Sequence, residues 1–126
     1  MDQKSPPLLT YVKVIRTLEA MPFKLFFLPS YERCLKGLGS RERSAAGLVV
    51  SALLEYFQSG VPASGEPYIA QIGPRSYRLV FKKLRGNIWE AYLEGQVRIL
   101  TRLEHDKHFL VCVGNHDDVK RFLKEQ

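Results

Sequence analysis

The sequence predicts an α+β domain of two layers, in which a small antiparallel meander sheet packs against a helical hairpin, with one more helix at the C-terminus. Two observations predict this class. Apolar residues recur at helical spacing in the first half of the chain, whereas short alternating or continuous apolar runs dominate the second half. With 126 residues and 45% hydrophobic content, the chain has the size and composition of one globular domain.

The first segment with a clear pattern is Leu8–Ala20. Its apolar residues fit a helical stripe, while its many β-branched residues also fit a strand; the helical spacing persists longer and favours a helix that Pro22 ends. The N-terminus has no apolar signal core, and no apolar run is long enough to span a bilayer. We therefore expect a cytoplasmic protein without membrane association.

One strand and two helices are predicted next. The aromatic and apolar run Phe23–Leu28 is typical of a short strand. Ser30 is placed to cap a helix over Tyr31–Leu38. A second helix begins at Ser40 and continues to about Ser59, because its apolar residues form one wide stripe. These helices, joined by a few residues, are the predicted hairpin.

The second half of the chain reads as extended segments separated by turns. The turns are expected at the basic run Lys82–Gly86, at Glu94-Gly95 and at His105–Lys107. A terminal helix over Asp117–Glu125 would place an acidic residue at its positive end. The predicted extended segments are Tyr68–Ile72, Ser76–Phe81, Asn87–Leu93, Gln96–Leu103 and His108–Gly114.

The formal charge of +6 favours contact with phosphates or with an acidic protein partner. Between Arg75 and Arg102 there are seven basic residues and two acidic ones, and aromatic residues are interleaved among them, a combination that suits single-stranded RNA. The alternative is a basic segment that is simply solvated. The residues that we interpret as RNA- or phosphate-binding are Lys82, Lys83, Arg85, Arg78 and Arg102.

The cysteines and histidines indicate neither a metal site nor a cofactor. Cys34 and Cys112 are far apart in the sequence, and we expect both to be free, buried thiols, Cys112 being inert. The spacing of His105, His108 and His116 matches no metal-binding pattern. No phosphate-binding glycine loop is present.

Three stretches in order resemble the RelE/ParE superfamily of small bacterial toxins. FKLFFLPSYERCLKGL is similar to the family's opening strand and first helix. KKLRGNIWEAYLEGQVRIL resembles its basic loop and the two strands that follow, with the motifs Trp-Glu-x-Arg and Arg-Ile/Val-Leu. FLVCVGNHDDVKRFL resembles the Gly-x-His-Asp-Asp ending of some members. The resemblance covers residues 23–126, which makes residues 1–22 an N-terminal extension.

The resemblance implies a toxin of a toxin–antitoxin system that cleaves messenger RNA, free or bound to the ribosome, and is held by a small acidic antitoxin. Two departures favour a non-catalytic relative instead, such as a gyrase-blocking toxin or a binding module. Many members carry arginine where Ala91 stands, and the ending here is acidic and imidazole-bearing rather than basic. A third reading is an orphaned prophage domain whose extension covers its own active face.

Cleavage of RNA without a metal needs proton transfer and a cation for the phosphate. We expect Arg98 to supply the cation, although a salt bridge to Glu90 on the neighbouring strand is the alternative. We expect His116 to act as acid or base, and Asp117 or Asp118 to orient its ring. The alternative for this acidic cluster is capping of the last helix. The candidate catalytic residues are therefore Arg98, His116 and Asp117.

Overall fold

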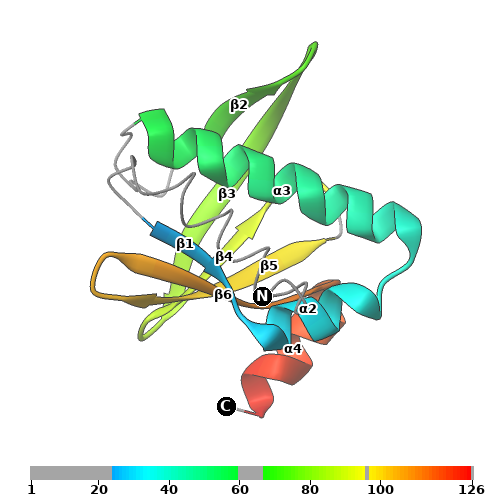
Figure 1. Cartoon of the computed structure of the whole chain (residues 1–126), viewed down its shortest axis with the longest axis vertical. Coiled ribbons are helices and arrows are strands. Elements are labelled where there is room, and N and C mark those ends of the chain that lie inside the picture. Colours follow the sequence, from blue (N-terminus) through cyan, green and yellow to red (C-terminus); the bar gives the residue numbers. More distant parts are fainter. Residues whose placement is uncertain (1–23, 60–66, 96, 126) are drawn as a thin grey trace, which may run out of the picture.

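A computed structural model describes residues 24–59, 67–95 and 97–125 of the chain. These residues form an α+β fold with a curled, six-stranded mixed sheet and three helices (Figure 1). The predicted helix over Leu8–Ala20 lies outside the described residues. The elements in chain order are β1 (Lys24–Phe27), α2 (Pro29–Lys36), α3 (Ser40–Ser59), β2 (Tyr68–Ile72), β3 (Arg75–Arg85), β4 (Ile88–Tyr92), β5 (Arg98–Glu104), β6 (Lys107–Gly114) and α4 (His116–Lys124).

The strand order is β1-β6-β5-β4-β3-β2. Strands β2 to β6 pair antiparallel with their chain neighbours, whereas β1 pairs in parallel with β6. The expectation of antiparallel pairing throughout is therefore wrong for β1. Helices α2 and α3 carry the chain from β1 to the opposite edge of the sheet, so that the last strand, β6, reaches β1 in the same direction.

Helix α3 covers one face of the sheet, and its buried side chains contribute to the main core with inward residues of the strands, such as Ile99 and Leu79. Helices α2 and α4 lie together beside β6 (Figure 1). The predicted helical hairpin is not confirmed, because α2 packs mainly on β6 whereas α3 packs on β2 to β5. Each of the two helices therefore packs more extensively on the sheet than on the other helix.

A β-bulge in β6 divides the apolar residues of that strand between two cores. Leu100 is paired with Cys112 and Thr101 with Leu110, which leaves Val111 as the extra residue. Val111 and Cys112 consequently face the second core, formed with Val119 of α4, while Leu110 faces the main core. Because the residues of β6 are divided between two cores, nearly all of them are apolar, and the strand has a continuous apolar sequence.

Two local predictions are corrected. The segment Lys82–Arg85 was expected in a turn, but it continues β3 to Arg85, where a register shift follows Lys83. Gly86, with φ of 53°, makes the turn instead. Ser30 is not a cap: α2 begins at Pro29, which needs no N–H partner in the first turn, and the Ser30 hydroxyl donates to the Val111 carbonyl at 2.7 Å. Among the described residues, no helix is both long and apolar enough to cross a membrane.

Candidate functional site

Arg98 begins β5 on the sheet face opposite α3, because its neighbours Val97 and Ile99 are buried in the main core. Its Nη1 lies 3.3 Å from Glu90 Oε2 on β4, and its guanidinium lies 4.0 Å from the ring centroid of Tyr92. The ion pair that the sequence left open as an alternative is therefore formed. Glu90 is buried, so its charge needs this partner.

The guanidinium is not fully satisfied by these contacts. Arg98 Nε is buried and has no hydrogen-bond partner among the described residues. The side chain remains 22% exposed. An arginine can offer five N–H donors, and the two contacts with Glu90 and Tyr92 leave some of them for an acceptor that comes from outside. Arg98 can therefore hold an anion at the surface without breaking the fold.

The sheet register brings the start of α4 beside Arg98. Arg98 pairs with Gly114, the last residue of β6, so the residues that follow Gly114 emerge next to it. Together, Gly95, Arg98, Asn115, His116 and Asp117 line an open pocket of about 350 Å³. We call it the Arg98 pocket. All three candidate catalytic residues, which come from segments separate in the sequence, line this one pocket.

The first turn of α4 is held by a capping box. The Asp118 backbone N–H donates to Asn115 Oδ1 at 2.8 Å, and the Asn115 N–H donates to Asp118 Oδ2 at 3.1 Å. Gly114 has to be glycine, because a Cβ there would lie 2.6 Å from the Cβ of Asp118. The capping alternative is thus confirmed for Asn115 and Asp118. His116 and Asp117 stay exposed at the pocket.

The orienting role expected for the acidic residues has no hydrogen bond to support it. Asp118 also forms an ion pair with Arg121 at 3.2 Å. Among the contacts of the described residues, neither Asp117 nor Asp118 bonds to the His116 ring. Any pairing of His116 with Asp117 would therefore have to form when a ligand enters the pocket.

The predicted RNA-binding residues do not form a single patch. Lys82 shares the face of Arg98, because it pairs with Glu90 across β3 and β4, and its Nζ lies 5.9 Å from the Tyr92 ring centroid. Lys83 pairs with Trp89 and so belongs to the opposite face. The two lysines therefore lie on opposite faces of the sheet, because neighbours in a strand point to opposite sides, and their role in binding RNA stays a prediction.

The three arginines of the predicted group already have partners. Arg102 pairs with Glu104 at 2.7 Å, and Arg78 lies 3.9 Å from Glu94, with both side chains exposed. Arg85 donates from Nη2 to the carbonyl of Leu123 at 2.9 Å, so it holds the end of α4. On β3, Lys82 and Arg78 lie on the face of Arg98, each two positions from Val80, which pairs with Tyr92 beside Arg98.

Ala91 stands where many members of the RelE/ParE superfamily carry arginine, and its position in the fold bears on that difference. Ala91 is fully buried on the face that α3 covers. An arginine at this position would therefore point into the core. The neighbouring Tyr92 pairs with Arg98 and shares its face. The β4 position that lies beside Arg98 on its own face is 92, and here that position holds the ring that stacks on Arg98. The alternation of β4 was the signal that could have found Tyr92.

His108 belongs to the core and not to the pocket. Its ring lies stacked on Phe57, edge-on to Trp89, with Nδ1 3.0 Å from Thr101 Oγ1. Burial lowers the pKa of His108 to about 4. In the described part of the chain, no group of three or more His, Cys, Asp or Glu side chains is arranged to hold a metal ion.

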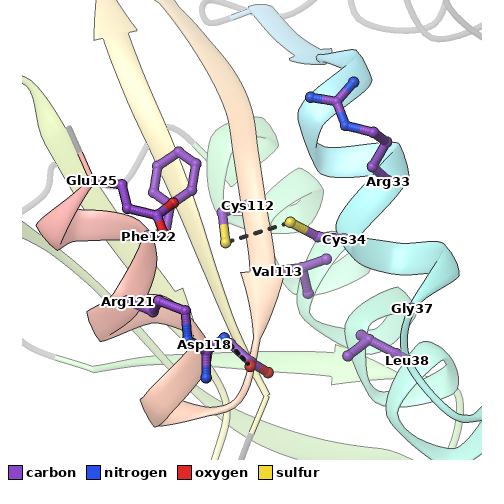
Figure 2. Close-up of a pocket in the computed structure, with 10 residues that line it drawn as sticks. All are labelled: Arg33, Cys34, Gly37, Leu38, Cys112, Val113, Asp118, Arg121, Phe122 and Glu125. Atoms are coloured by element: carbon purple, nitrogen blue, oxygen red, sulfur yellow. Dashed lines mark hydrogen bonds and ion pairs between the residues drawn. The ribbon is translucent and has the colours of Figure 1, made fainter.

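A second pocket, of about 290 Å³, lies between α2, β6 and α4 (Figure 2). Its lining includes Cys34, Cys112 and Phe122, with Arg33 and Arg121 at its sides. The two cysteines, which the sequence placed in unrelated elements, have their Sγ atoms 3.6 Å apart.

No protein-family model matches this chain, and the comparison with curated proteins finds no significant relative. The function is therefore argued from the geometry of the Arg98 pocket and from the resemblance noted in the sequence.

Proposed function

We propose that this protein is a metal-independent endoribonuclease that cleaves messenger RNA in the Arg98 pocket, as the toxin of a RelE-type toxin–antitoxin system. One observation carries the proposal. Arg98, His116 and Asp117 line one open pocket, although Arg98 lies in β5 whereas His116 and Asp117 begin α4, after β6. A guanidinium, an imidazole and a carboxylate are groups from which RNA cleavage without a metal can be built.

In this mechanism the 2′-hydroxyl of RNA attacks the adjacent phosphorus and the bond from phosphorus to the 5′-oxygen breaks, which yields a 2′,3′-cyclic phosphate. The leaving 5′-oxygen takes a proton from water and becomes a free hydroxyl. Arg98, whose side chain is 22% exposed, binds the phosphate through guanidinium N–H groups that Glu90 does not take, and stabilises the charge that develops on the non-bridging oxygens. His116 takes the proton of the 2′-hydroxyl and so acts as the general base. Asp117 lies next to it in the chain and orients the ring once RNA is bound.

The surroundings of the pocket suit a single-stranded substrate. Tyr92 already stacks on Arg98, and Lys82 lies near the same ring, so an aromatic face and two cations are available to one nucleotide. The charge of +6 suits RNA and also a small acidic antitoxin. Messenger RNA and ribosomes place this function in the cytoplasm.

The test measures cleavage of a labelled RNA oligonucleotide, and of messenger RNA in a cell-free translation mixture, the first in the presence of a chelator. We expect wild-type protein to produce 2′,3′-cyclic phosphate ends and not to cut the 2′-deoxy analogue. Arg98→Ala and His116→Ala should each lower the rate at least about 100-fold. Arg98→Lys should recover only part of the rate, because a lysine cannot make two parallel hydrogen bonds to a phosphate.

The matched control is His105→Asn, which removes an exposed histidine from the β5–β6 turn, where φ of 60° also suits asparagine. This variant should cleave at the wild-type rate. Equal cleavage by wild type, Arg98→Ala and His116→Ala would remove the site assignment. Complete absence of cleavage in both assays would remove the enzymatic proposal itself.

A non-catalytic module that binds nucleic acid or protein is the second candidate. Two observations favour it: the guanidinium of Arg98 is already paired with Glu90, and the first turn of α4 is already capped by Asn115, with Asp118 completing the capping box. In that case, RNA should bind without being cut, or DNA gyrase should lose supercoiling activity when the protein is added. Fluorescence anisotropy with uncut RNA and a supercoiling assay distinguish these outcomes from cleavage.

A further inference from the structure

The two cysteines of the chain meet at the junction of α2 and β6, although 78 positions separate them. Cys34 lies in α2 and Cys112 in β6, and Figure 2 shows their side chains directed toward each other. Their Sγ atoms are 3.6 Å apart. The sequence contains two cysteines, and these two lie in contact with each other.

Their approach is fixed by contacts on both sides. The Leu28 N–H donates to the Leu110 carbonyl at 3.1 Å, and the Ser30 hydroxyl donates to the Val111 carbonyl at 2.7 Å, so the start of α2 is anchored along β6. The bulge at Val111 turns Cys112 out of the main core toward α2 and α4. The sulfur contact is therefore a consequence of the fold and not of two freely rotating surface side chains.

We infer that Cys34 and Cys112 are a redox-modification site, which forms a reversible intramolecular disulfide when the protein meets a peroxide or a small-molecule disulfide such as oxidised glutathione. This inference is independent of the proposed RNA cleavage. It needs the sulfur atoms to approach from 3.6 Å to the bond length of about 2.05 Å. This movement is a rotation of the two side chains toward each other.

The two thiols differ in access, and this sets the order of the steps. Cys34 is half-buried and lines the pocket of about 290 Å³ between α2, β6 and α4, whereas Cys112 is buried. Burial, with Cys34 and Asp118 as smaller causes, raises the pKa of Cys112 far above that of an ordinary thiol. An oxidant therefore meets Cys34 first, and Cys112 resolves the product.

With a peroxide, the Cys34 thiolate attacks one oxygen, the O–O bond breaks, and Cys34 becomes a sulfenic acid while water is released. Cys112 then attacks the Cys34 sulfur, and its proton leaves with the hydroxyl group as a second water. The two thiols lose two electrons and two protons, and the peroxide is reduced to two waters. With oxidised glutathione, Cys34 first forms a mixed disulfide, and Cys112 displaces the second glutathione thiolate.

The test exposes the native protein to glutathione redox buffers and then measures its mass and free thiols. Wild-type protein should lose both thiols together and two hydrogen atoms in mass, as a monomer, and reduction should restore it. Peptide mapping should recover the segments containing Cys34 and Cys112 joined by a disulfide. Because the bond closes a long loop, oxidised protein should unfold about 10 °C higher than reduced protein.

The matched variants separate the two steps. Cys112→Ser should retain one glutathione on Cys34, whereas Cys34→Ser should resist modification under the same native conditions. If Cys112→Ser does not fold, the peptide map of wild type and the Cys34→Ser reaction still decide the matter. Two free thiols in strongly oxidising buffer, glutathione on both cysteines, or disulfide-linked dimers in place of the joined peptide would overturn the inference.

Discussion

Lowering the pH from neutrality to about 4 should destabilise this protein through His108. The ring of His108 is buried among Phe57, Phe81 and Trp89, and this burial lowers its pKa from 6.5 to about 4. In the unfolded chain the same imidazole is exposed and takes up a proton near pH 6.5. Between these two values the unfolded state binds more protons than the folded state, so stability falls as the pH falls.

The magnitude follows from the two pKa values. At about 1.4 kcal/mol per pKa unit, the fall from 6.5 to about 4 corresponds to about 3 kcal/mol of stability that is present above pH 6.5 and lost by pH 4. A domain of this size is stable by about 5–15 kcal/mol in total. The loss through one histidine is therefore large enough to measure.

The assay is urea unfolding at a series of pH values, on wild-type protein and on His108→Gln, which keeps a polar side chain but cannot titrate. Carboxylates contribute to the pH dependence of both proteins, so the difference between the two curves isolates His108. Stability of wild type should fall more steeply between pH 6.5 and 4 than that of the variant, by about 3 kcal/mol over the range. The exposed His105, changed to Asn, should leave the wild-type slope unchanged. Parallel curves for wild type and His108→Gln would refute the reasoning.

Two further predictions concern the faces of β4 and the capping box at the start of α4. Ala91→Arg should lower the free energy of unfolding in urea by more than about 4 kcal/mol, because it buries a charge among apolar side chains. Tyr92→Arg, on the opposite face, should lower it much less. Similar losses for the two variants would contradict the assigned faces. Asn115→Ala should lower stability by about 1 kcal/mol, and Asn115→Asp should recover most of this loss, because asparagine and aspartate can both accept from the Asp118 N–H. An alanine variant as stable as wild type would show that the capping box contributes nothing.

Local sequence patterns were informative about the elements of the fold. The wide apolar stripe of Ser40–Ser59 predicted a helix whose bounds the structure reproduces. In β5, Arg98 faces away from Val97 and Ile99, as the alternation of side chains along a strand requires. The spacing of apolar residues is enough to identify these elements and their buried sides, because it depends only on residues within the same helix or strand. It fails at Lys82–Arg85, where a run of charges looked like a turn although β4 pairs with it.

What the sequence determined by itself is therefore the α+β class, most helices and strands, the basic charge and the inward faces of the regular strands. The tertiary structure alone decided the parallel pairing of β1 with β6, the bulge that splits Val111 from Leu110, and the contact of Cys34 with Cys112. It also brought His116 to Arg98, through the pairing of Arg98 with Gly114. These features join residues far apart in the chain, and such contacts depend on which elements become neighbours when the apolar surfaces of the whole chain are buried together.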